Sequence, residues 1–168
     1  MMRVLISGFF FLAVVLFETS FLSSVPSVLA MTPLVFALSV YLIQHQNRLD
    51  GVFWLIGYGI FLEAFHLSVI PLPFLPYAFA ATASFISARQ VFSNRSLYGI
   101  AGCALTGWAT AAFGEALIKM GASLAGHSVP NWGMWLQTIS LRALLLIGAI
   151  YIIFYVARPF QHVWGSRL

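Results

Sequence analysis

One apolar stretch, residues 51–70, constrains the fold more than any other part of this sequence. It is long and apolar enough to cross a lipid bilayer, yet it carries Glu63 and His66 in its last third. These two residues are three positions apart, so they share one face of a helix. A carboxylate inside a membrane is costly unless it faces a protein interior or water. The chain must therefore fold so that other segments accommodate Glu63.

The composition of the whole chain is strongly apolar. Of its 168 residues, 61% are hydrophobic and 7% are charged, whereas soluble domains average about 25% charged residues. The Lys and Arg residues are scattered singly, so they form no basic patch for nucleic acid. We therefore expect an all-α membrane protein that forms one transmembrane domain over residues 1–168.

Six apolar segments alternate with short polar or proline-containing turns. We expect six transmembrane helices, over residues 4–25, 31–43, 52–69, 74–88, 97–118 and 134–156, the last one ended by Arg158 and Pro159. Small residues let membrane helices approach closely. The glycines that we expect at helix contacts are Gly57, Gly59, Gly99, Gly107 and Gly114.

The first segment also has features of a cleavable signal peptide. Arg3 precedes an apolar run, and residues 28–30 (Val-Leu-Ala) are similar to a cleavage site. Glu18 interrupts the run well before that site, and the rest of the chain is apolar as well. We therefore expect the segment to be retained as a membrane span.

The basic residues indicate an orientation. If the chain starts in the cytoplasm, the outer loops contain a single basic residue, Lys119, and all the others outside the spans are cytoplasmic. This is the bias of the positive-inside rule, and it predicts that both termini lie in the cytoplasm. The cytoplasmic residues would be Arg3, Arg48, Arg89, Arg95, Arg158 and Arg167.

Four charged residues from four predicted spans then lie at a similar depth. At about 1.5 Å per residue, all four are in the outer half of the bilayer, with His66 and Lys119 slightly further out. The four residues are Glu18, Glu63, Glu115 and Arg142. We expect Glu63 to pair with Arg142, or to line an outward-facing polar cavity with it.

Two roles for this cluster remain open. The charged groups can form inter-helix bonds that hold the bundle together, or they can line a cavity that takes a ligand or a partner's segment. Glu63 and His66 have no further His or Cys at a suitable spacing for a metal site. We expect no metal and no cofactor, and because no nucleophile has a positioned base, we expect a protein that is not an enzyme.

Several short motifs resemble the MreD family, the small rod shape-determining membrane proteins of bacteria. Residues 18–22 (Glu-Thr-Ser-Phe-Leu) are similar to the stretch that ends the first helix of that family. Residues 33–36, followed by Tyr41 and Leu42, resemble the start of its second helix. Gly51, Gly57 and Gly59 lead to an acidic residue, Glu63, as in its third helix, where Asp is usual. The small-residue segment that ends in Arg89 is similar to its fourth helix.

The resemblance implies a non-enzymatic scaffold of the cell-elongation complex, which synthesises lateral peptidoglycan, in the bacterial inner membrane. The implied partners are an MreC-like protein, RodA, a penicillin-binding transpeptidase and MreB, besides membrane lipid. The implied fold is similar to the substrate-binding subunit of energy-coupling factor transporters, with six helices around an outward-opening cavity.

That similarity provides the alternative function, a vitamin-binding subunit of an energy-coupling factor transporter. Such subunits commonly carry an Ala-x-x-x-Ala pattern on the first helix, which docks to the coupling subunit. Residues 4–18 contain only Ala13, which favours the scaffold.

Overall fold

A computed structural model shows an all-helical chain. It describes residues 2–22, 24, 28–44, 49–65, 72–125 and 130–164, and no strand occurs among them. The elements in chain order are α1 (Met2–Leu16), a π-helix (Phe17–Leu22), a 3-10 helix (Val28–Met31), α2 (Leu34–Gln44), α3 (Asp50–Ala64), α4 (Phe74–Gln90), α5 (Leu97–Leu124) and α6 (Trp132–Trp164). The all-α prediction is thereby confirmed for the described part of the chain.

The predicted helix starts agree well with those observed, but some ends do not. α4 begins at Phe74 and α5 begins at Leu97, as predicted. Pro76 is accommodated in the first turn of α4, where a backbone N–H has no partner within the helix. The prediction that Arg158 and Pro159 end the last helix is wrong, because α6 continues to Trp164. A proline inside a helix removes one hydrogen bond without necessarily ending the helix.

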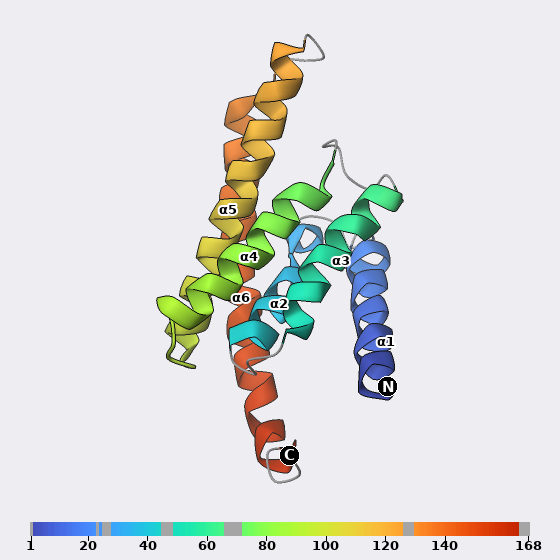
Figure 1. Ribbon diagram of the computed structural model, residues 1–168, viewed down its shortest axis with the longest axis vertical. Helices are drawn as coiled ribbons and strands as arrows, with labels where there is room; N and C mark the ends of the chain where they lie inside the picture. Colours follow the sequence, from blue (N-terminus) through green and yellow to red (C-terminus); the bar gives the residue numbers. More distant parts are fainter. Residues whose placement is uncertain are drawn as a thin grey trace.

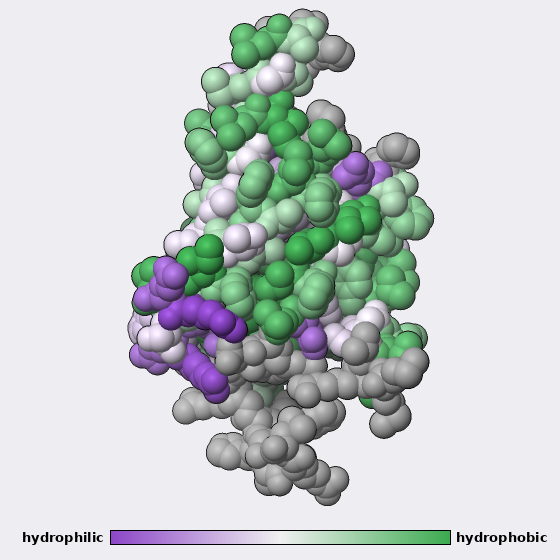
Figure 2. Space-filling model, viewed as in Figure 1, coloured by the Kyte–Doolittle hydropathy of each residue, from purple (hydrophilic) through white to green (hydrophobic). Residues whose placement is uncertain are grey.

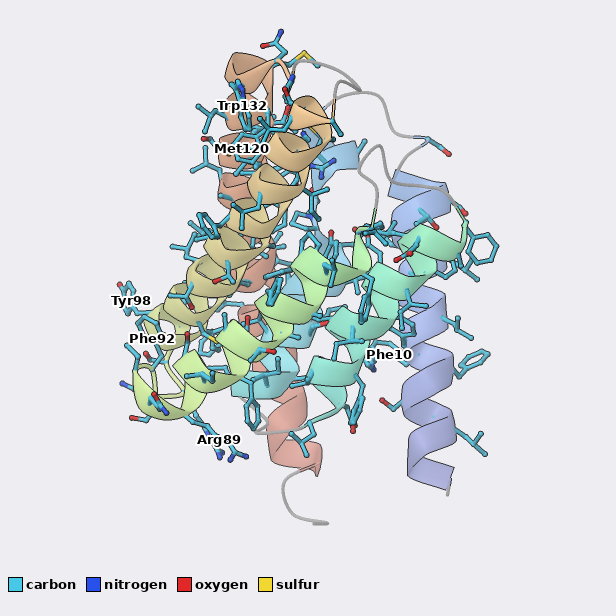
Figure 3. The ribbon with its side chains drawn as sticks, turned by 45° about the horizontal axis from the view of Figure 1, so that its top comes forward. Phe10, Arg89, Phe92, Tyr98, Met120 and Trp132 are labelled. Atoms are coloured by element: carbon cyan, nitrogen blue, oxygen red, sulfur yellow. The ribbon has the colours of Figure 1, made fainter. Side chains whose placement is uncertain are left out.

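The six α-helices run alternately up and down (Figure 1). The first residues of α1 and the last residues of α6 lie towards the same end of the molecule, and the α4–α5 turn lies towards that end as well. α5 and α6 form a long hairpin that projects beyond the other helices at the opposite end. Met120 and Trp132 mark that end in Figure 3, whereas Arg89, Phe92 and Tyr98 mark the end with the α4–α5 turn.

Only one helix of the described residues is both long and apolar enough to cross a membrane. This is the 26-residue segment Trp132–Ala157 of α6. Only 17% of its most apolar part is buried, which is unlike the core helix of a soluble protein. Two apolar segments, Leu5–Phe21 and Leu34–Gln44, are shorter. The six predicted spans therefore remain a prediction.

The second predicted span, residues 31–43, forms a helix that is shorter and more buried than a lipid-facing membrane span would be. α2 has 11 residues, about 16 Å of helix, and it contacts α1, α3, α4, α5 and α6. Eight of its residues are buried, including Phe36, Val40 and the polar Ser39 and Gln44. Its apolar sequence thus reflects burial among other helices, which periodicity alone does not distinguish from contact with lipid.

Large apolar side chains are exposed over the outer faces of several helices (Figure 2). Soluble monomers rarely expose apolar patches of more than a few hundred Å². Polar surface in this view gathers over the α4–α5 turn. Among the most exposed side chains are Leu5, Phe9, Phe53, Val91, Phe113, Leu144 and Ile152. This distribution is typical of a protein that contacts lipid or partner helices.

Most of the glycines predicted at helix contacts face a neighbouring helix. A Cβ atom at Gly59 would lie 2.9 Å from the Phe74 Cα of α4, and one at Gly107 would clash with Ser84 Oγ, also on α4. Gly114 faces Pro76 of α4, and Gly57 faces Phe11 of α1.

Gly99 differs from these four glycines. A Cβ atom there would clash with the backbone carbonyl oxygen of Asn94, in the turn before α5. Gly99 therefore lets the turn close against α5, and it does not separate two helices.

We predict that Gly59→Ala destabilises the protein by about 1–3 kcal/mol relative to a matched control, because its methyl group meets backbone of α4. The control is Gly148→Ala on α6, where an added Cβ has no neighbour within 4 Å. Both changes bring the same gain in helix propensity. Thermal unfolding in detergent micelles measures the difference, and equal stability of the two variants would contradict the close packing of α3 on α4.

Candidate functional site

A cavity of about 770 Å³ brings together three of the five predicted site residues, Glu18, Glu115 and Arg142. Its lining comes from the π-helix, the 3-10 helix and helices α3 to α6. Lys119 also lines the cavity and adds a second basic group. Aromatic side chains form much of the remaining wall, namely Tyr58, Tyr77, Trp108 and Trp135.

Glu18 joins three parts of the chain through its carboxylate. Its Oε2 accepts a hydrogen bond of 2.6 Å from the Val35 backbone N–H, in the first turn of α2. Its Oε1 accepts a hydrogen bond of 2.7 Å from the Tyr58 hydroxyl of α3. The first N–H groups of a helix have no partner within it, and the helix dipole there favours negative charge. The carboxylate therefore caps α2 and ties it to α3.

The π-helix places Glu18 for this role. Residues Phe17–Leu22 form a wider turn than the α-helix that precedes them. Thr19 donates a hydrogen bond from its hydroxyl to the Val15 carbonyl oxygen, at 2.8 Å. Val15 is fully buried against Val35 and Tyr58, so the start of the π-helix is anchored where α1 meets α2 and α3.

A continuous row of four aromatic rings begins at Tyr58, the partner of Glu18, and three of the rings line the cavity. The Tyr58 ring meets the Tyr77 ring edge-on at 5.2 Å, and Phe36 lies between Tyr77 and Trp108 at 6.4 and 5.4 Å. The Trp108 indole N–H donates to the Ile139 carbonyl oxygen of α6 at 3.3 Å. Edge-to-face aromatic pairs stabilise beyond their buried area. The row therefore connects α3, α4, α2, α5 and α6.

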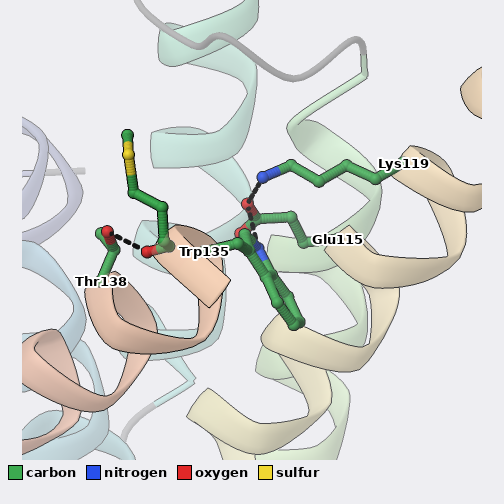
Figure 4. A network of polar contacts seen from close by, with 5 residues as sticks. Glu115, Lys119, Trp135 and Thr138 are labelled. Carbon is green, nitrogen blue, oxygen red and sulfur yellow. Dashed lines mark hydrogen bonds and ion pairs between the residues drawn. The ribbon is translucent and has the colours of Figure 1, made fainter. Parts of the chain in front are cut away.

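Glu115 belongs to a separate polar group at the α5–α6 hairpin (Figure 4). Its Oε1 lies 3.0 Å from the Lys119 Nζ, one turn later on α5, and accepts a hydrogen bond of 2.8 Å from the Trp135 indole N–H of α6. The Lys119 ammonium also lies 5.5 Å from the centre of the Trp135 ring. This group fastens α5 to α6.

Arg142 lines the same cavity from α6 and is exposed there. Its positive charge acts electrostatically on the Glu18 carboxylate. Among the described residues, no hydrogen bond or ion pair to its guanidinium is found. Both acids of the cavity are thus bonded to other groups, whereas Arg142 has no such partner among the described residues.

Glu63 is not where the sequence led us to expect it. It does not line the cavity, and the described residues show no ion pair between Glu63 and Arg142. The residue before it, Leu62, does line the cavity. Successive helical residues are rotated by about 100°, so Glu63 lies on a different face of α3. His66 lies outside the described residues.

The partners of Glu18 were not predicted from the sequence. Tyr58 lies on the buried face of α3, together with Leu55 and Gly59. Pro33 directly before α2 was a usable signal, because it marks a helix start whose free N–H groups can bind a carboxylate. The hydroxyl of Tyr58 had no such signal, since its position depends on how α3 packs.

The described residues contain no group of three or more His, Cys, Asp or Glu side chains that could hold a metal ion. Comparison with family models, with curated proteins and with solved structures finds no match to this chain. The sequence motifs, the cavity and the hydrogen bonds of its acids are therefore the basis for the proposed function.

We predict that Glu18→Ala destabilises the protein by about 2 kcal/mol or more, because it leaves the Val35 N–H and the Tyr58 hydroxyl without their acceptor. In a double-mutant cycle, Glu18→Ala and Tyr58→Phe are expected to be coupled by about 0.5–3 kcal/mol. The measurement is unfolding in detergent micelles.

Glu63→Ala is the control for Glu18→Ala, because Glu63 is an acid on a neighbouring helix and has no bonded partner among the described residues. Its effect is expected to stay within about 0.5 kcal/mol. Additive effects of Glu18→Ala and Tyr58→Phe, or a Glu63→Ala effect as large as that of Glu18→Ala, would show that the carboxylate does not join α2 to α3.

Proposed function

We propose that this chain is a six-span protein of the bacterial inner membrane that acts through protein contacts, as an MreD-like scaffold of the cell-elongation complex. The observation that carries the proposal is the pair of hydrogen bonds by which the Glu18 carboxylate joins α2 to α3. Residues 18–22 and 33–36 contribute to the MreD resemblance, and both segments take part in the bond between Glu18 and Val35. These residues serve to position helices, which suits a scaffold.

The membrane location is supported by length and by surface. α1 with its π-helical extension comprises 21 residues, and α5 and α6 have 28 and 33. About 20 residues suffice to cross a bilayer. The exposed apolar side chains on α1, α3, α4, α5 and α6 give these helices a surface that suits lipid. In this proposal the shorter helices α2, α3 and α4 cross the bilayer as well.

The orientation is supported by the arrangement of the ends. The start of α1, the end of α6 and the α4–α5 turn lie towards one end of the molecule (Figure 1). Arg89 lies in the last turn of α4 and Arg95 lies in the α4–α5 turn itself, whereas Lys119 lies near the opposite end of α5. With the positive-inside rule, the arginine-bearing end is cytoplasmic and the 770 Å³ cavity opens outward.

A role without catalysis is supported by the bonding of the polar groups. The carboxylate oxygens of Glu18 and the Oε1 of Glu115 accept hydrogen bonds or an ion pair from groups that hold helices together. Cys103, a potential nucleophile, is fully buried and donates to the Ser84 carbonyl oxygen. None of these three residues forms an activated nucleophile beside a base.

We predict that depleting the protein from its rod-shaped host rounds the cells, and that the purified protein brings down an MreC-like partner. Microscopy and mass spectrometry of the purified complex measure the two results. Complementation with Glu18→Ala is expected to restore rod shape less well than complementation with the control variant Gly148→Ala. Normal shape after depletion, with no such partner, would contradict the scaffold.

The cavity favours a second candidate, the vitamin-binding subunit of a transporter. Its volume suits a small molecule, and its wall combines aromatic rings with Arg142, a basic group that has no bonded partner among the described residues. If this candidate is correct, one water-soluble vitamin raises the unfolding temperature of the purified protein, and Arg142→Gln abolishes that shift. A panel of vitamins that gives no shift in the unmodified protein would contradict it and leave the scaffold favoured.

A further inference from the structure

A second cavity, of about 420 Å³, lies at the end of the molecule that carries the α4–α5 turn. Its polar lining consists of Gln44, Arg89, Ser93 and Arg95. Ile43, Phe85 and Ala88 provide an apolar wall. The cavity adjoins the last residues of α2 and α4, whereas the larger cavity is lined by Thr32 and Pro33, just before α2, and by the first turn of α4. The two cavities are therefore distinct sites.

Buried hydrogen bonds hold the turn that forms this cavity. Gln44, the last residue of α2, is only 5% exposed. Its side-chain amide donates to the carbonyl oxygens of Phe92 and Asn94, on both sides of Ser93. The Ser96 hydroxyl then accepts from the Gly99 N–H and caps α5. The positions of Ser93 and Arg95 are thus set by the buried end of α2.

The described lining of this cavity carries two positive charges and no acidic side chain. Arg89 and Arg95 are both exposed, and no acidic side chain is among its described lining residues. No ion pair or hydrogen bond to either guanidinium is found within the described parts of the chain. The Arg89 guanidinium lies 4.2 Å from the centre of the Phe85 ring, which orients it. Two guanidinium groups without an ion-pair partner among the described residues favour an anion with several oxygens, such as a phosphate group.

We propose that this cavity binds the phosphate of an anionic phospholipid. The two arginines and the Ser93 hydroxyl would bind the phosphate oxygens, and Ile43, Phe85 and Ala88 would contact the glycerol and the first methylenes. Tyr98 and Val91 are strongly exposed beside the turn, and Figure 3 shows Tyr98 near Phe92 at this end. Exposed tyrosines are typical of the membrane interface. The inference rests on the membrane location proposed above.

Native mass spectrometry of the delipidated protein in detergent micelles tests the site, with phosphatidylglycerol and phosphatidylcholine as probes. We expect tighter binding of phosphatidylglycerol. Arg89→Gln and Arg95→Gln are each expected to weaken it about fivefold, and the double variant is expected to lose the preference. Arg3→Gln is the matched control, because it removes one charge from the same predicted side of the membrane at another place.

Three results would overturn the proposal. Equal binding of the two lipids by the unmodified protein would show that the site does not select an anionic lipid. A loss of preference in Arg3→Gln as large as that in Arg89→Gln would show a general surface-charge effect. Binding of glycerol 3-phosphate as tight as that of phosphatidylglycerol would show that the source of the phosphate is a soluble ester.

Failure of the membrane location gives a different result from failure of the lipid site. Before the titration, the protein is mixed with phosphatidylcholine vesicles and floated on a density gradient. A protein that does not float with the vesicles contradicts the membrane location and overturns the lipid site with it. A protein that floats but shows no preference for phosphatidylglycerol overturns the lipid site alone.

Discussion

The bonds of the Glu18 carboxylate are the interaction on which the arrangement of the helices depends most. α2 is short and buried, and it contacts the five other α-helices. Its first N–H groups point into the protein, where leaving them without acceptors would cost free energy. Glu18 provides an acceptor for one of them and simultaneously binds Tyr58 of α3. One carboxylate thereby fixes where α2 begins relative to α1 and α3.

Small residues then decide how closely the remaining helices pack. Gly59 of α3 and Gly107 of α5 both face α4, from two sides. α4 can therefore lie between its two neighbours with its backbone near theirs. Membrane helices gain little from withdrawing apolar surface from lipid, so their association depends on such close contact and on hydrogen bonds. The large apolar side chains are left for the outer surface.

The two ends of the molecule differ in how their charges are satisfied. At the end proposed to face outward, Glu18 and Glu115 are bonded within the protein, and Arg142 lines a cavity without a partner among the described residues. At the other end, two arginines border a smaller cavity with no acid among its described lining residues. The two ends therefore present different polar groups in their cavities, acids and bases at one end and two arginines at the other.

The sequence alone determined the helical class, the starts of α4 and α5, and three of the polar residues that line the larger cavity. These features depend on local properties: apolar length, proline, and the rise per residue along a helix. Depth along a helix can be read from residue numbers, so the sequence places Glu18, Glu63, Glu115 and Arg142 at a similar depth. All of these except Glu63 line one cavity.

Only the tertiary structure decided which of these residues face one another. The rotation of each helix about its axis is set by packing against neighbours, and one position of difference directs Leu62 into the cavity and Glu63 away from it. The same packing gave Glu18 its two donors and made α2 an interior helix. A sequence pattern shows which face of a helix is apolar, but a helix that is apolar on nearly all sides leaves its rotation undetermined.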